Sequence, residues 1–138
     1  MITGIFLKGS PAVEIDIWGV LPTNKKKFTG IIDTGFTGFV QIPFIPALGL
    51  GLVLETISTF TLADGSSSSQ LMCWGVISLN SIQVTGLISL SMGGQDVLLG
   101  TDWLEKMKLE LRVDCLEKQV SLVNITPTPI SPSELSSN

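Results

Sequence analysis

The stretch Ile31–Val40 places the strongest constraint on how this chain folds. Two β-branched residues lead into Asp33, a polar segment with two glycines follows, and the chain then becomes apolar again. β-Branched residues favour strands, while Gly35 and Gly38 permit backbone angles that a Cβ disfavours. We therefore expect a buried strand that ends on a carboxylate, followed by a tight loop and a second strand.

Asp33 stands out because its neighbours in the sequence lack positive charge. No Lys or Arg lies within five positions on either side. A buried carboxylate without a cation resists ionisation, so we expect Asp33 to ionise reluctantly or to share a proton with a second acid. The adjacent Thr34 offers a hydroxyl that can bond to the backbone or to a partner loop. The competing interpretation is that Asp33 is an ordinary turn residue, since Asp and Gly are common in turns.

The rest of the chain has the periodicity of a β-rich fold. Val13, Ile15 and Ile17 alternate with Glu14 and Asp16, which predicts a half-buried strand whose acids face solvent. A turn is expected at 9–11. The other predicted strands cover residues 4–7, 28–32, 39–42, 52–62, 71–79, 82–90, 108–114 and 119–123, with one helical turn at 45–50 and a short helix at 101–107.

The strands 52–62 and 71–79 form a predicted hairpin. Ala63, Asp64 and Gly65 lie between them and are a strong turn signal. We expect the serines of Ser66–Ser69 to continue the loop as a polar, mobile segment. An ordinary surface hairpin is the simplest interpretation of this pattern.

A weak internal repeat relates the two halves of the chain. Ile31–Thr34 and Leu98–Thr101 each place two large aliphatic residues before a small or acidic residue and then a threonine. The second copy leads into the predicted short helix, where Thr101 or Asp102 is expected to cap the N-terminus and Glu105 to reach back to it.

Ile31–Gly35 resembles the hydrophobic-hydrophobic-Asp-Thr-Gly loop of aspartic proteases. The resemblance is closest to the retropepsin-like (clan AA) group, including its stand-alone bacterial members. The loop, the hairpin and the repeat Val97–Gly100 with its helix occur in the order typical of that group, over most of residues 4–124. The resemblance implies an all-β fold: a closed acid protease barrel with one short C-terminal helix, an internal pseudo-twofold and a flap hairpin.

The resemblance also implies an aspartic endopeptidase without metal or cofactor. Gly100 takes the place of Asp33 in the second copy, so each chain supplies one catalytic acid and a homodimer is needed. Thr34 and Gly35 would support the loop, and the hairpin tip would close over a polypeptide substrate. Asp102 is a rival second acid, but a cap or first-turn role explains it better. Phe36 departs from the viral pattern, where Ala or Ser is usual.

The flap tip is expected at Ala63, Asp64 and Gly65, which would bind substrate through backbone groups. Two further functions stay open at this point. The chain is alternatively a catalytically silent protease-like fold that acts as a peptide-binding or dimerisation module, or a structural barrel in which Asp33 has no catalytic role.

Composition excludes several kinds of site. The chain has no histidine, which removes Ser-His and Cys-His catalysis and the usual zinc ligand. Cys73 and Cys115 are too few for a structural zinc site. They can form one disulfide, but free buried thiols are expected, because nothing marks the chain as secreted.

Charge and hydropathy limit the partners. The net charge of −4 does not indicate a basic surface that binds nucleic acid. Lys25–Lys27 is expected to be a solvated turn. The apolar run 45–54 is too short to span a bilayer, and no signal peptide is recognised, so we expect a cytoplasmic protein without membrane contact. Charged residues make up only 14%, which favours a face buried against a partner chain. The expected domain is 1–125, and the Pro/Ser-rich segment 126–138 is expected to be a disordered tail.

Overall fold

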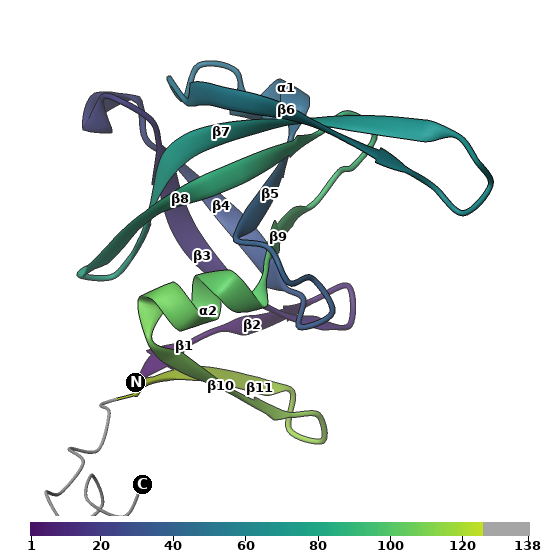
Figure 1. Cartoon of the computed structure of the whole chain (residues 1–138). Helices are drawn as coiled ribbons and strands as arrows, with labels where there is room; N and C mark the ends of the chain where they lie inside the picture. Colours follow the sequence, from purple (N-terminus) through teal and green to yellow (C-terminus); the bar gives the residue numbers. More distant parts are fainter. Residues whose placement is uncertain (126–138) are drawn as a thin grey trace, which may run out of the picture.

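A computed structural model describes residues 1–125 of the chain. The expected tail at 126–138 lies outside the described residues. The elements, shown in Figure 1, are β1 (Ile2–Thr3), β2 (Ile5–Leu7), β3 (Ser10–Trp18), the 3₁₀ turn η1 (Pro22–Asn24), β4 (Lys26–Ile32), β5 (Val40–Pro43), α1 (Phe44–Ala47), β6 (Val53–Thr61), β7 (Ser67–Leu79), β8 (Ile82–Ser91), β9 (Val97–Leu99), α2 (Thr101–Met107), β10 (Leu109–Asp114) and β11 (Gln119–Asn124).

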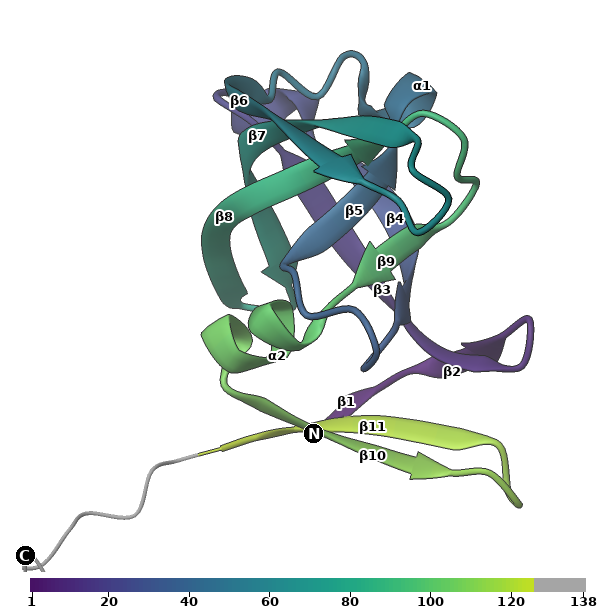
Figure 2. The ribbon, with the colours of Figure 1, turned by 45° about the vertical axis from the view of Figure 1, so that its right-hand side comes forward.

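Most strands belong to one sheet that closes into a barrel. Its eight strands follow the order β2-β3-β4-β9-β5-β8-β7-β6, and an additional pairing of β3 with β7 joins distant parts of the sheet. A separate three-stranded sheet, β1-β11-β10, lies across one end of the barrel beyond α2 (Figure 2). The predicted all-β barrel with a short helix near its C-terminal end is therefore found.

The barrel core is filled by one face of the strands β3, β4, β5, β7, β8 and β9. In β3, Val13, Ile15 and Ile17 are buried while Glu14 is exposed, as the alternation predicts. Burying each such side chain stabilises the fold by about 1.5–3 kcal/mol. From α2, Trp103 and Met107 are buried against the same core.

The internal repeat is visible in the register of two central strands. β4 runs parallel to β9, with Gly30, Ile31 and Ile32 opposite Val97, Leu98 and Leu99. Residue for residue, this is the alignment that places Asp33 opposite Gly100. In each strand the second aliphatic residue, Ile32 or Leu99, is buried in the core, while the first, Ile31 or Leu98, is half-buried on the opposite face.

Several local expectations are wrong. Lys26 and Lys27 belong to β4 and pair with β3, so the expected turn at Lys25–Lys27 does not include them. Ser10 and Pro11 belong to β3, so the turn is at Lys8–Gly9. Ser67–Ser69 is not loop but the start of β7, since these serines pair with β6. Gly100 is the N-cap residue of α2, so the expected capping box of Thr101 or Asp102 with Glu105 does not form.

Both cysteines are free, as expected, but only one is buried. Cys73 lies in the core, and its burial raises the pKa of the thiol. Cys115 is exposed in the turn between β10 and β11, which corrects the expectation of two buried thiols. Separately, α1 and α2 are too short to cross a membrane, and residues 1–125 contain no other α-helix.

Candidate active site

Asp33 follows β4 directly and is held by its own loop. Its backbone N–H donates to the carbonyl of Leu99 at 2.9 Å, which continues the pairing of β4 with β9. The Gly35 N–H donates to Asp33 Oδ1 at 2.9 Å, and the Phe36 N–H donates to the Asp33 carbonyl at 3.1 Å. These bonds fix the carboxyl at the end of a rigid strand, because Ile32 before it is buried in the core.

In the single chain Asp33 is half-buried rather than buried, and Thr34 beside it is exposed. This corrects the expectation of a fully buried carboxylate. The reason is geometric: the loop lies at the surface of the barrel, and only β4 behind it is in the core. Within residues 1–125, nothing covers the exposed part of Asp33.

Neither loop glycine has an unusual backbone angle, but a side chain at either position would press on a neighbouring side chain of the loop. Left-handed φ occurs at other glycines, while Gly35 and Gly38 lie outside that region. A Cβ at Gly35 would lie 3.3 Å from Asp33 Oδ1, and one at Gly38 would lie 2.6 Å from the Phe36 ring. The Phe36 ring therefore packs against the backbone of Gly38 and stays within its own loop.

The second copy of the motif cannot carry an acid. A Cβ at Gly100 would lie 2.0 Å from the carbonyl oxygen of Gly38 and 2.7 Å from that of Phe36. The N–H of Gly100 donates to the Phe39 carbonyl at 2.9 Å, and the N–H of Thr101 donates to that of Phe36 at 2.9 Å. These bonds tie the second copy to the Asp33 loop so closely that only glycine fits at position 100.

Asp102, the rival acid, lies in the first turn of α2. Its Oδ2 accepts a bond from Lys106 Nζ at 2.6 Å, four residues along the helix. A carboxylate at this position also interacts favourably with the positive end of the helix. The first-turn interpretation of Asp102 is therefore supported, and Asp102 does not line the hollow that holds Asp33.

A hollow of about 510 Å³ lies beside the Asp33 carboxyl. Among residues 1–125, Asp33 is the single acid in its lining, and most of the other side chains are apolar. The lining residues are Ser10, Pro11, Ile31, Ile32, Asp33, Thr34, Leu98, Leu111 and Val113. Mostly apolar hollows with a few polar groups are typical of ligand sites.

Sequence patterns did not identify four of these residues. Ser10 and Pro11 start β3, while Leu111 and Val113 belong to β10. They reach Asp33 only through the long-range arrangement of two sheets. The sequence places Leu111 and Val113 on one face of a predicted strand and Ser10 and Pro11 in a predicted turn, but no local signal linked any of them to Asp33.

The predicted flap is a long hairpin of β6 and β7. It projects beyond the barrel on the side that carries the Asp33 loop (Figures 1 and 2). The tip is Leu62–Ser66, where Gly65 has φ +88 and its N–H donates to the Leu62 carbonyl at 2.9 Å. Ala63, Asp64 and Gly65 are exposed there, and they do not contribute to the part of the Asp33 hollow that residues 1–125 form.

Asp64 organises the tip. The Ser66 hydroxyl donates to Asp64 Oδ1 at 2.6 Å, and the Ser66 N–H donates to the same oxygen at 2.9 Å. These bonds lower the pKa of the Asp64 carboxyl, the hydroxyl bond more than the backbone bond. Further down the stem, Trp74 Nε1 donates to Glu55 Oε2 at 2.9 Å, so the Trp74 indole lies on the outer face of the hairpin.

Within residues 1–125, no three His, Cys, Asp or Glu side chains gather as ligands for a metal ion. The chemistry that the site offers is that of a carboxyl group with fixed orientation, an adjacent hydroxyl and a mostly apolar hollow.

Comparison with known proteins identifies the family. The sequence profile described as retroviral aspartyl protease matches residues 10–127. Among solved structures, the EIAV protease complexed with the inhibitor HBY-793 is similar, with a TM-score of 0.53 and 14% identity over 72% of this chain and 88% of that chain. At that identity the likeness shows the fold alone, and it confirms the predicted retropepsin-like barrel. No curated protein matches the chain. The chain belongs to the retroviral aspartyl protease family.

Proposed function

We propose that the protein is an aspartic endopeptidase that works as a homodimer, with Asp33 of each subunit meeting at the twofold axis. The observation that carries this proposal is the pair Asp33 and Gly100. One motif copy supplies an acid, and the other has no room even for a Cβ. Because Asp33 is the single acid that residues 1–125 bring to the hollow, the second carboxyl would come from a second copy of the chain.

Two carboxyls about 3 Å apart do not both ionise, and aspartic proteases in general share one proton between them. The ionised Asp33 would accept a proton from a water molecule while the oxygen of that water attacks the scissile carbonyl carbon. The protonated Asp33 of the partner would donate to the carbonyl oxygen. In the resulting gem-diol, the Asp33 that took the proton from water would donate it to the nitrogen as the C–N bond breaks. The partner's Asp33, now ionised, would accept a hydroxyl proton of the diol, which restores the starting pair without a covalent enzyme intermediate.

Thr34 and β10 support a subunit contact next to Asp33. Thr34 is exposed in the single chain, although it lines the hollow with Asp33. β10 is an edge strand of its sheet, and Val113 on it is 38% exposed. Exposed strand edges pair readily with other chains. A twofold contact through these residues would cover the hollow on its open side and bury Asp33 further.

The flap tip would close over the bound polypeptide. Ala63, Asp64 and Gly65 lie at the end of a long hairpin, whose stem is paired along its length and can stay paired while the tip moves. An extended substrate would accept backbone hydrogen bonds from the tip, and closure would exclude water from the reacting bond.

The test is hydrolysis of an unstructured protein at several values between about pH 3 and pH 7, where carboxyl pairs in aspartic proteases work. Wild type is expected to cleave, and Asp33→Asn to lose at least about 100-fold in rate, the scale of general acid–base catalysis. Asp102→Asn is the matched control and should retain activity. Equal cleavage by wild type and Asp33→Asn, or cleavage by neither at any pH, would overturn the proposal. In the second case, retained peptide binding would identify a silent binding module.

A further inference from the structure

One end of the molecule exposes a segment that is both apolar and basic. Residues 20–27 run from the end of β3 through η1 into β4, and all of them are exposed. The segment begins with Val20 and Leu21, which are 67% and 55% exposed, and ends with the run Lys25–Lys27. Large aliphatic side chains that gather on a surface are typical of interaction sites.

A second exposed turn, which follows α1, packs beside this segment. The Val20 N–H donates to the Gly51 carbonyl at 3.0 Å, and Lys26 Nζ donates to the Leu48 carbonyl at 3.4 Å. Leu48 is itself 55% exposed. The two turns therefore form one surface, which we call the apolar–basic patch. It consists of Val20, Leu21, Leu48, Lys25 and Lys26.

Acidic residues are almost absent from the part of the sequence that builds this patch. Residues 17–54 contain three lysines and a single acid, Asp33. Asp33 follows the last residue of β4, whereas Lys26 is the first residue of that strand, so the two lie about 20 Å apart at the rise of an extended chain. The chain as a whole has a net charge of −4, and the positive patch is a local departure from it.

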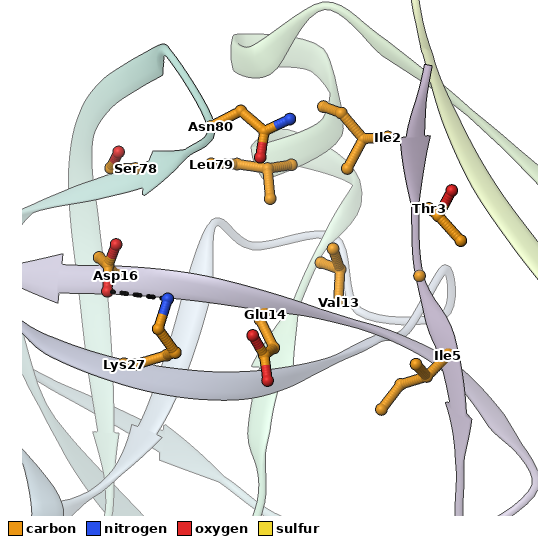
Figure 3. A pocket seen from close by; sticks show the side chains of 11 residues that line it. Ile2, Thr3, Ile5, Val13, Glu14, Asp16, Lys27, Ser78, Leu79 and Asn80 are labelled. Carbon is orange, nitrogen blue, oxygen red and sulfur yellow. Dashed lines mark ion pairs between the residues drawn. The ribbon is translucent and has the colours of Figure 1, made fainter.

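The two acids that border this part of the sequence already have partners. Asp16 pairs with Lys27, whose Nζ lies 3.7 Å from Asp16 Oδ1, as the dashed line in Figure 3 shows. Glu55 accepts the hydrogen bond from Trp74 Nε1. The other two lysines of the run take part in none of the ion pairs found within residues 1–125. Their charges are therefore available to an anionic partner.

We propose that the apolar–basic patch docks on the surface of an anionic lipid bilayer. Lys25 and Lys26 would lie at the level of the headgroups, where they are attracted to the negative charge of the lipids. Val20, Leu21 and Leu48 would enter the boundary between the headgroups and the acyl chains. Firm attachment to a bilayer surface generally needs two signals, and the patch combines an apolar with a basic one.

The position of the patch would leave the candidate active site free. Leu48 follows α1 directly, and Figure 1 shows α1 at the opposite end of the molecule from β10 and β11. The β10 edge that we propose as a subunit contact, and the Asp33 loop beside it, would therefore face away from the bilayer.

A bilayer fits this surface better than a peptide does. The three aliphatic side chains are each more than half exposed and stand on turns, so they project from the molecule, whereas ligands are generally held in concave sites. The inference departs from the expectation of no membrane contact, which rests on the lack of a spanning segment and of a signal peptide. Docking needs no hydrolysis, so the inference is independent of the proposed proteolysis.

The test is sedimentation of the full chain with vesicles of phosphatidylcholine, alone or mixed with an equal part of phosphatidylserine. Binding is expected on the anionic vesicles and not on the neutral ones, and it should weaken as salt is added. Lys25→Gln combined with Lys26→Gln should lower the partition coefficient by about fivefold for each lysine. Leu21→Ser should lower it by about threefold, because one aliphatic side chain no longer enters the bilayer.

The matched controls are exposed residues at the opposite end of the molecule. Lys108→Gln combined with Lys118→Gln removes the same charge, and Leu116→Ser removes an exposed leucine from the β10–β11 turn. Both control variants should bind as wild type does, and an unchanged urea midpoint would show that each variant is folded.

Four results would overturn the proposal. The first two are no binding to anionic vesicles and equal binding to neutral and anionic vesicles. The third is an equal effect of the patch and control substitutions. The fourth is a loss caused by the lysine substitutions with none caused by Leu21→Ser, which would indicate adsorption of a basic surface to any polyanion.

Discussion

At position 100 the chain needs glycine for space rather than for backbone freedom. The carbonyl oxygens of Gly38 and Phe36 approach so closely that a Cβ has no room. The same close approach binds the two motif copies together, and the absence of a side chain there is what limits each chain to one acid. A single residue thus connects the packing of the barrel centre with the second subunit that we propose.

Substituting Gly100→Ala should therefore destabilise the protein, by about 1–3 kcal/mol or more, because a backbone oxygen must move to admit the methyl group. Urea denaturation of wild type and variant measures this difference. Gly93→Ala is the matched control, since a Cβ there meets nothing within 4 Å. Equal loss of stability in the two variants would show that the contact at position 100 is not tight.

The two thiols should differ in reactivity. Cys115 is exposed, while burial shields Cys73 and raises the pKa of its thiol, so little thiolate is present. With a disulfide-exchange reagent at neutral pH, one thiol per chain should react quickly in the folded protein and the second only after denaturation. Two fast thiols, or none, would contradict the placement of Cys73 or the absence of a disulfide.

At the scale of elements, the hairpin of β6 and β7 combines a rigid stem with a tip held by one side chain. Ser66 bonds twice to Asp64, and these bonds favour the ionised carboxyl. Because the folded pKa is depressed, this contribution is fully present above the ordinary pKa of 3.8 and is lost as the pH falls through the lower folded value. The two Ser66 bonds are therefore expected to persist at neutral pH and to weaken only in acid below that value.

The protonation of the Asp64 carboxyl can be followed through the amide signal of Ser66. Its chemical shift should titrate with a midpoint below pH 3.8, and Asp64→Asn should abolish the transition. A midpoint at or above 3.8 would mean that the Ser66 bonds do not form in solution. Ser69, which pairs further down the stem, serves as the internal reference.

Much of the element pattern follows from local sequence. The alternation in β3, the aliphatic pairs of β4 and β9, and the turn signal at Gly65 all predicted the observed elements. Ser67–Ser69 was missed because serine has little preference for strands by itself. Its place in β7 depends on pairing with β6, and such tertiary pairing overrides local propensity.

At the scale of the whole molecule, the candidate site was only partly predictable. The Asp33 loop and its second copy carry a local signature, whereas Leu111 and Val113 reach the hollow through a second sheet. The half-exposure of Asp33 was also missed, because burial of this residue depends on what covers the loop and not on the strand before it. The domain limit of 125 and the cytoplasmic location stay predictions.

The central claim is that each active site needs one Asp33 from each of two chains. The direct measurement mixes equal amounts of wild type and Asp33→Asn, unfolds and refolds them together, and compares the rate with that of wild type at the same total concentration. Random pairing in a twofold dimer predicts about one quarter of the wild-type rate, since only wild-type pairs hold two acids. A rate of about one half, the value expected if each chain works alone, would contradict the account.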